Sequence, residues 1–353
     1  MLTYKEDWGT AKQRLLAWWD REIIDRVVIQ VTAPRPGRRV VTPPDDLVRR
    51  WTDVDYVLDA AEARLEGTYY AGESFPCYWP NLGPDVFAGY LGCEIQFGEN
   101  TSWSVPFVKE WWQFPCVQFD RQNRWWELTQ LMLERGGERF QGKAILGFTD
   151  IHGGGDAVAA LRDPQTLALD LVDHPEEVLM AMECVESIWF DVYAEQLDLI
   201  RQYSAGASTW MNLWHPGKWY PVSCDFICMI SPAMVEKFIL PELLAEISYL
   251  DRSIFHLDGP GALKHLDALL AIDKLGAIQW VPGANSGPIA QWFPILKRIQ
   301  AAGKGLQIHI EPRELESVME TLRPEGLCIC TGASTIEEAD ALVQRAKALT
   351  HAR

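Results

Sequence analysis

The sequence has no apolar run of about 18 residues, which is the length that a membrane-spanning helix needs. Its first segment, MLTYKEDWGTAKQRLLAWWDRE, is charged and has neither the apolar centre nor the small-residue cleavage site of a signal peptide. The eight cysteines among 353 residues are irregularly spaced, which does not fit a disulfide framework. We therefore expect a cytoplasmic protein that does not bind membranes and keeps its thiols reduced.

Basic residues are also scarce. The chain carries 32 Lys and Arg against 49 Asp and Glu, a net charge of −17. Proteins bind nucleic acids and anionic membrane surfaces through clusters of Lys and Arg, so neither is an expected partner. The sequence also lacks a nucleophile elbow, a P-loop, a protein-kinase motif set and the spacing of a zinc finger.

What the sequence has instead is a regular alternation of short apolar runs with helical segments. This rhythm predicts parallel strands joined by right-handed crossovers. Eight runs favour closure into a (β/α)₈ TIM barrel, one domain over residues 1–353, with an open doubly wound sheet as the competing architecture. The expected strands are Val27–Ala33, Lys143–Phe148, Ala207–Leu213, Tyr220–Cys224, Arg252–Phe255, Ala277–Val281, Leu306–Ile310 and Leu327–Cys330.

Two further regions precede the regular alternation. Residues 4–22 and 44–66 are expected to form N-terminal helices, the second beginning at a PP-DD start. Residues 68–126 combine proline, glycine and clustered aromatics, with signals for one short helix and a hairpin. We interpret them as an aromatic-rich insertion between the first two strands that partly covers the barrel mouth. A lid of purely structural value is the alternative.

In a barrel, all strand C-termini open onto one face, and that face holds the active site. His256 and Asp258 lie two residues apart at a strand end, so both side chains fall on one face. Together with Cys330 they are candidate metal ligands, and a set of N, O and S donors suits zinc. Each also has a structural alternative: a hydrogen-bonded histidine, an aspartate that shapes a turn, and a core cysteine.

Other residues near the ends of the predicted strands are candidates for catalysis and for binding a small-molecule substrate. Asp225, His215 and Glu311 are the candidate catalytic acids and bases, although His215 is as well suited to holding its own loop. The sixteen tryptophans predict an aromatic lining. The predicted substrate-binding residues are Trp210, Asn212, Trp214, Trp280, His152 and His309.

From about residue 143 to 350 the chain resembles the superfamily of uroporphyrinogen decarboxylase and the corrinoid-linked methyltransferases, which share one (β/α)₈ barrel. Weaker similarity in DRVVIQVTAP extends the resemblance to most of the chain. The order and spacing of the segments are more specific for the superfamily than for any one activity. The segments that carry the resemblance are KAILGFTDIHGGGDAVAALRD, DLVDHPEEVLMAMECVESIWFDVYAEQLDLI, ISPAMVEKFILPEL and FHLDGPGALKHL followed by AIQWVPGA.

The sequence departs from the family patterns in several places that bear on activity. Uroporphyrinogen decarboxylases carry M-R-Q-A-G-R after strand one and a G-H-G type sequence at the last strand, where this chain has VTAPRPGRR and CTGAST. The methyltransferases hold zinc with an H-x-C pair and a late cysteine. Here the pair is His256-x-Asp258, and Cys330 matches the late cysteine. Related methionine synthases add a glutamate to this site, on the sixth strand. In this chain Trp280 lies near that place, and Glu311 follows one strand later.

The resemblance implies a methyltransferase that moves a methyl group between a small substrate and a corrinoid protein or a thiol. It implies zinc as the metal and a corrinoid carried by a partner protein that docks over the barrel mouth. Two other functions stay open: a metal-independent decarboxylase or lyase with Asp225, His256 or His215 as proton donor, and a non-catalytic ligand-binding barrel. A homodimer is one option for the quaternary structure.

Overall fold

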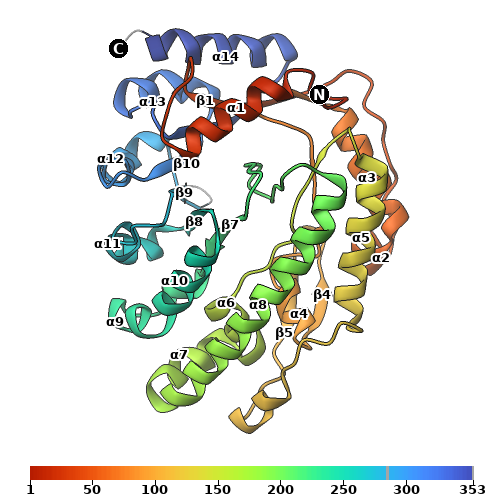
Figure 1. The fold of residues 1–353 in the computed structure, drawn as a ribbon, viewed down its shortest axis with the longest axis vertical. Helices are drawn as coiled ribbons and strands as arrows, with labels where there is room; N and C mark the ends of the chain where they lie inside the picture. Colours follow the sequence, from red (N-terminus) through yellow and green to blue (C-terminus); the bar gives the residue numbers. More distant parts are fainter. Residues whose placement is uncertain (284–285, 352–353) are drawn as a thin grey trace.

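The computed structural model describes residues 1–283 and 286–351 and shows a mixed α/β fold with a central, mostly parallel sheet (Figure 1). Seven strands pair in the order β2-β1-β11-β10-β9-β8-β7. All neighbours are parallel except β2, which is antiparallel to β1. The strands are β1 (Val28–Pro34), β2 (Thr68–Gly72), β7 (Trp219–Ser223), β8 (Arg252–Asp258), β9 (Ala277–Val281), β10 (Gly305–His309) and β11 (Leu327–Gly332).

Helices cover the outer side of this sheet and continue around the rest of the molecule (Figure 1). Five alternate with the later strands: α10 (Leu240–Tyr249), α11 (Leu266–Leu270), α12 (Phe293–Ala301), α13 (Leu315–Thr321) and α14 (Ile336–His351). The others are α1 (Trp8–Trp19), α2 (Leu47–Thr52), α3 (Val54–Glu66), α4 (Val86–Tyr90), α5 (Arg124–Phe140), α6 (Gly154–Arg162), α7 (Pro164–Asp173), α8 (Pro175–Tyr203) and α9 (Pro232–Met234).

Single turns precede or extend several of these helices. They are η1 (Trp111–Cys116), η2 (Asp225–Met229), η3 (Val235–Ile239), η4 (Pro260–His265), η5 (Ile289–Trp292) and η6 (Pro312–Glu314), of which η3 is a π-helical turn. The η2 turn matters for the site because it begins directly after β7. Within the part of the chain that the structure describes, no helix has both the length and the apolar character needed to cross a membrane.

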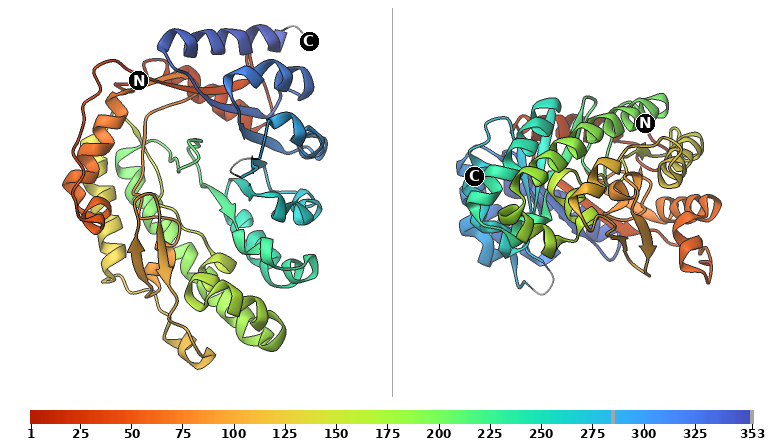
Figure 2. Two further views of the ribbon diagram at one scale, coloured as in Figure 1. Left: turned by 180° about the vertical axis from the view of Figure 1, so that it is seen from behind. Right: turned by 90° about the horizontal axis from the view of Figure 1, so that it is seen from below.

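The sheet is open, so the predicted TIM barrel is not confirmed. Strand pairing among the described residues runs from β2 to β7, while β3 (Cys77–Tyr78) and β6 (Ile145–Leu146) form a separate parallel pair. The prediction of a strand over Ala207–Leu213 is wrong. It makes isolated bridges and then turns, because Asn212 adopts a left-handed conformation with φ of 53°. Figure 2 shows this segment, between α8 and β7, running inside the layer of helices.

The region interpreted as an insertion, residues 68–126, is partly sheet. Its first part supplies β2 and β3, which pair with β1 and β6, so these residues belong to the framework. These two strands were not predicted from the sequence, because they are short and lie among prolines and glycines. The short helix expected near Pro84–Leu91 is present as α4, and the hairpin is present as β4 (Glu94–Phe97) and β5 (Ser102–Val105).

Two hydrophobic clusters lie on the two sides of the sheet. The larger one packs the outward-facing side chains of the strands, such as Phe255 and Trp280, against the helices. The smaller one collects inward-facing side chains from several strands, among them Ile254 and Cys328, with Trp18 and Trp19 of α1. Because successive side chains of a strand alternate between faces, residues two apart point into the same space. The inner face therefore positions the candidate site.

Candidate active site

A cavity of about 780 Å³ opens on the inner face of the sheet, toward the carboxyl ends of the strands. Five neighbouring strands each contribute one inward-facing polar side chain: Gln30 of β1, His256 of β8, Gln279 of β9, Gln307 of β10 and Cys330 of β11. Four of them line the cavity, and Gln307 is fully buried between its neighbours. A burial of this kind is stable only when the polar groups satisfy one another.

These side chains form one continuous chain of hydrogen bonds across the five strands. His256 Nδ1 lies 2.5 Å from Gln279 Oε1, and Gln279 Nε2 donates to Gln307 Oε1 over 2.8 Å. Gln307 Nε2 contacts Cys330 Sγ at 3.6 Å, and the Cys330 thiol donates to Gln30 Oε1 at 3.2 Å. A fully connected polar network of this kind fixes the orientation of each member.

The chain determines which nitrogen of His256 is available. Gln279 uses its amide nitrogen to bond Gln307, so its oxygen faces His256 and accepts a hydrogen bond from Nδ1–H. Nε2 then carries the free lone pair and can bind a metal or accept a proton. The ring edge is further held by Trp210, whose ring centroid lies 4.9 Å away at 87°. His256 is thus oriented so that Nε2 is its free nitrogen.

Asp225 and Asp258 stand beside His256. One ligand atom from each of the three residues lies within 4.8 Å of the others, which is a spacing suited to one metal ion. Asp258 ends β8, and Asp225 begins the η2 turn after β7. Burial raises the pKa of Asp225, and the carboxylate of Asp156 raises it further. A cation in this position would relieve that repulsion.

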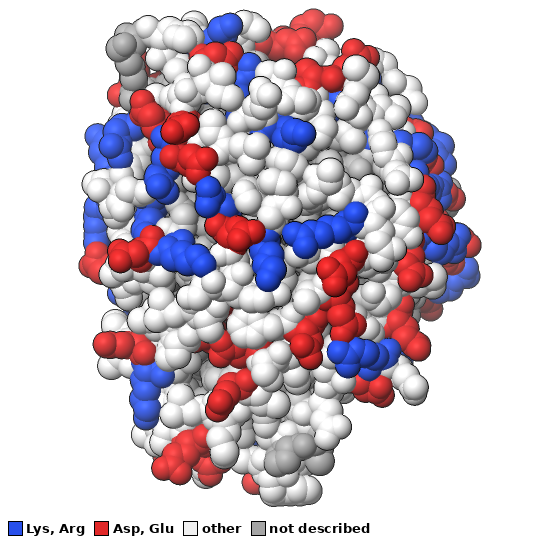
Figure 3. All heavy atoms as spheres, in the orientation of Figure 1, with Lys and Arg blue, Asp and Glu red and all other residues white. Residues whose placement is uncertain are grey.

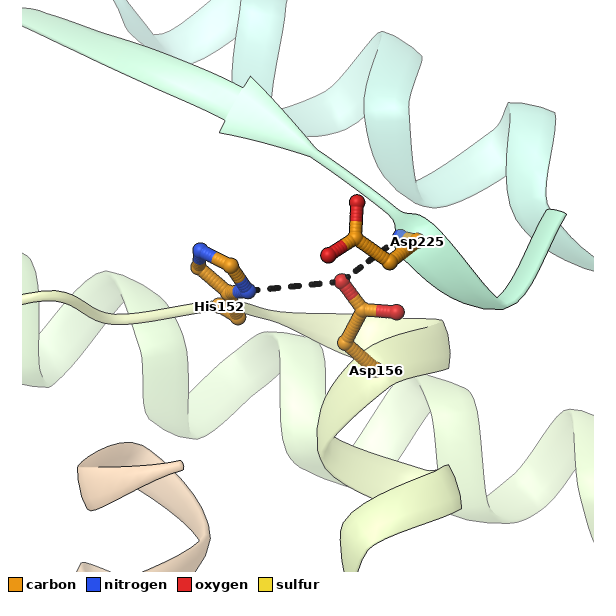
Figure 4. A group of neighbouring side chains, drawn as sticks. All are labelled: His152, Asp156 and Asp225. Carbon is orange, nitrogen blue, oxygen red and sulfur yellow. Dashed lines mark hydrogen bonds and ion pairs between the residues drawn. The ribbon is translucent and has the colours of Figure 1, made fainter. Parts of the chain in front are cut away.

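Asp225 also belongs to a second group of three, shown in Figure 4 with His152 and Asp156. His152 Nε2 lies 3.0 Å from Asp150 and Nδ1 lies 3.5 Å from Asp156. Burial alone would lower the pKa of His152, but Asp150 and then Asp156 hold it well above 6.5. An imidazole with carboxylates at both nitrogens is a protonated charge partner, so it does not suit metal binding.

Asp156 is the residue that holds Asp225 in place. It lies in the first turn of α6, and its two oxygens accept hydrogen bonds from the backbone N–H groups of Asp225 and Phe226, each at 2.9 Å. The same carboxylate approaches His152, so one side chain ties the α6 start to the η2 turn (Figure 4). His152 and Asp225 line a second cavity of about 500 Å³, next to residues of the 84–106 segment.

The glycine-rich start of α6 makes room for buried acids. Gly155 N–H donates to Glu242 at 3.0 Å, and a Cβ added to Gly154 would lie 1.5 Å from Glu242 Oε2. Glu246 packs against Gly153 in the same way. Burial raises the pKa of Glu242 to about 8 and that of Glu246 well above its ordinary value. The DIHGGGD sequence is therefore explained by packing against α10.

Three predicted binding residues do line the main cavity: Trp210, Asn212 and His309. The backbone oxygen of Asn212 accepts a hydrogen bond of 2.6 Å from Gln30. Desolvation in the cavity, followed by the nearby charge of His256, lowers the pKa of His309. His152, by contrast, lines the second cavity, so its predicted role at the main one does not follow from its position.

Four other predicted site residues lie elsewhere. His215 and Trp214 precede β7, at the amino end of the sheet, where they contact Trp19 of α1. Trp280 faces outward and packs on Trp292 with ring centroids 5.0 Å apart, because Gln279 takes the inward position of β9. The fourth, Glu311, forms a capping box at the start of η6. Neither cavity is lined by any of these four residues.

Cys330 reaches the cavity but joins neither group of possible metal ligands among the described residues. Its sulfur is occupied by Gln30 and Gln307. The predicted set of His256, Asp258 and Cys330 is therefore not assembled, and Asp225 stands where the third ligand would be. Sequence reasoning missed Gln30, Gln279, Gln307 and Asp156. The glutamines had a signal, because each interrupts an otherwise apolar strand (VIQV, AIQWV and GLQIH).

Comparison with known proteins adds information on the fold. No protein-family model matches the chain, and no curated protein matches it. A solved structure, a methyltransferase from Methanosarcina mazei, is similar over 97% of this chain and 99% of that chain, with a TM-score of 0.62 and 13% sequence identity. At that identity the likeness shows a shared fold alone. The resemblance to a specific superfamily stays a prediction.

Proposed function

We propose that this protein is a methyltransferase whose reaction takes place around His256. The observation that carries the proposal is the position of the Asp225–His256–Asp258 group between two cavities. His256 lines the main cavity, and Asp225 lines the second. A methyl transfer joins two reactants at one point, so a reactive group bordered by two cavities suits it. The similar fold of the M. mazei methyltransferase supports the same assignment.

The zinc set that the family resemblance implies, with a late cysteine, does not fit these residues, because Cys330 is held in the glutamine network. One nitrogen and two carboxylates fit a divalent cation of the borderline to hard type, zinc included. Asp225, His256 and Asp258 would hold it, with Gln279 orienting the imidazole from behind. Such a cation supplies Lewis-acid chemistry and lowers the pKa of a bound thiol or water.

The chain's own residues have separate tasks in this proposal. Trp210 covers one side of His256 and keeps its ring from turning. Asp156 holds the η2 turn so that Asp225 stays beside His256. The second reactant, which gives a methyl group to the small substrate or receives one from it, would be a corrinoid on a partner protein, as the family resemblance implies.

The experiment is a methyl-transfer assay with methylcobalamin and a simple thiol, 2-mercaptoethanol. The loss of the methylcobalamin absorbance measures the transfer. We expect turnover in the purified protein, a loss of about 100-fold or more in His256→Ala, and no change in His174→Ala, where an exposed histidine is removed. No transfer with any thiol or amine tested would contradict the proposal. Turnover of a carboxylic acid that survives chelation would favour a metal-independent decarboxylase or lyase instead.

A further inference from the structure

We propose that the main cavity, whose lining includes Arg64, Tyr70 and Trp210 as hydrogen-bond donors, binds a carboxylate group of the small-molecule ligand. The inference deepens the proposed function, because it assigns a chemical class to the ligand of the same cavity. It depends on that function only for the ligand's role as a substrate, since the binding itself follows from the side chains of the wall.

The charge of the cavity lining differs from that of the whole chain. The protein has a net charge of −17. Among the described residues that line the main cavity there is no Asp or Glu, whereas Arg64, His256 and His309 are present. In a protein so rich in acids, a large cavity lined without a carboxylate favours an anionic ligand, and the cation proposed at Asp225, His256 and Asp258 would offset the two carboxylates beside His256.

Tyr70 offers a donor with no acceptor. Its side chain is only 6% exposed, it lines the cavity, and its hydroxyl makes no hydrogen bond within the described part of the chain. The preceding residue on β2, Tyr69, faces the other way and donates to Asp340 at 2.8 Å. Buried hydroxyls without a partner are rare, because the lost hydration is not replaced. An acceptor atom of a ligand would complete the bonding of Tyr70.

Trp210 offers a second donor in the same cavity. Its indole Nε1 is shielded from solvent and has no hydrogen-bond partner among the described residues. An indole N–H can only donate, so a ligand that satisfies it must bring an acceptor. The same ring touches His256, which places this donor next to the proposed reaction centre. The ligand's acceptor group would thus be fixed at a short distance from His256.

Arg64 supplies the charge. It extends from the last turn of α3, is exposed toward the cavity and donates to the backbone oxygen of Cys77 at 3.1 Å. Tyr70 lines the same cavity, where burial raises its pKa to about 12 and the charge of Arg64 is the largest influence that opposes this rise. A guanidinium and two neutral donors match a carboxylate, which accepts several hydrogen bonds at once.

The test uses three probes with one skeleton: 3-phenylpropionate, 3-phenylpropanamide and 3-phenylpropylamine. Their affinities for the full chain are measured by isothermal titration calorimetry, without any turnover. We expect the carboxylate to bind about tenfold or more tightly than the amide, and the amine not to bind. Arg64→Met should remove the preference for the carboxylate, and Tyr70→Phe should weaken its binding several-fold. The control Tyr69→Phe, on the opposite face of β2, should change neither.

Equal affinity for the carboxylate and the amide, or carboxylate binding that is unchanged in both Arg64→Met and Tyr70→Phe, would overturn the inference. Arg64 is exposed, so its variant keeps the test valid even where Tyr70→Phe disturbs packing. The result is separate from the proposed function. Carboxylate binding without methyl transfer would sustain this inference and remove the methyltransferase, and transfer without a carboxylate preference would do the reverse.

Discussion

His256 Nδ1 and Gln279 Oε1 lie 2.5 Å apart, on neighbouring strands of the central sheet. This contact fixes the tautomer and direction of the imidazole, and Gln307 fixes Gln279 in turn. Metal-binding histidines in proteins are commonly oriented by a partner at the second nitrogen, most often a carboxylate or a carbonyl oxygen. The hydrogen-bonded side chains of five strands therefore determine that Nε2 of His256 is free to react.

Gln279→Leu tests this connection. The variant removes the acceptor of His256 and leaves Gln307 Oε1 buried without its donor, which costs about 1–3 kcal/mol. We expect metal affinity to fall by about 10–100-fold, measured by competition with a chelating dye. Gln344→Leu, at an exposed position on α14, should leave affinity unchanged. Unaltered affinity in Gln279→Leu would mean that the glutamine has no role in orienting His256.

The charge pair of His152 predicts a pH dependence of stability. Despite burial, Asp150 and Asp156 hold the pKa of His152 above its ordinary value of 6.5. The stabilisation is complete below pH 6.5 and is lost as the pH rises through the raised pKa of the folded state. In urea unfolding, His152→Gln should therefore lose more stability relative to the native chain at about pH 6 than at about pH 9. A difference independent of pH would show that folding does not raise the pKa of His152.

A substitution of Glu242, in contrast to one of His152, is expected to stabilise the protein. Its pKa is raised from 4.5 to about 8, chiefly by burial, so stability present below pH 4.5 is lost as the pH rises toward 8. Glu242→Gln keeps an acceptor for Gly155 and carries no charge. Its melting temperature relative to the native chain should rise more at about pH 8 than at about pH 5. Glu236→Gln, which is exposed, provides the control.

Gly154→Ala should be strongly destabilising. The residue has φ of 32°, and an added Cβ would lie 1.5 Å from the carboxylate of Glu242. We expect a loss of more than about 2 kcal/mol in the free energy of unfolding, measured by denaturant titration. Gly9→Ala in α1, where a Cβ meets no atom within 4 Å, should change stability by about 1 kcal/mol or less. Equal effects at both positions would contradict the packing of Glu242 against this turn.

Much of the sheet could be predicted from the sequence, because β8, β9, β10 and β11 are apolar runs separated by clear helices. The Ala207–Leu213 run failed as a strand because its apolar content serves a turn within the inner cluster, where Met211 and Leu213 are buried. Apolar content alone does not separate the two cases. The strands of the separate pair, β3 and β6, are two residues each, which is too short for a readable pattern.

The site was predictable to a smaller extent. His256 and Asp258 could be found because a strand end predicts their face, and Asp225 follows β7 in the same way. Trp280 takes the outer face of β9 because Gln279 takes the inner one, and the sequence of this strand alone does not tell which of the two faces inward. His215 lies before β7, beside Trp19 of α1, because a polar residue between two apolar runs can follow one strand or precede the next. Asp156 acts through backbone contacts that no local pattern reveals.

The proposed function rests on a divalent cation held by Asp225, His256 and Asp258, and metal analysis of the purified protein is the decisive measurement. Elemental mass spectrometry should find about one divalent metal per chain in the native protein and in Cys330→Ser, and none in His256→Ala or Asp225→Asn. Metal that is retained in both His256→Ala and Asp225→Asn, or that is lost in Cys330→Ser alone, would contradict the claim.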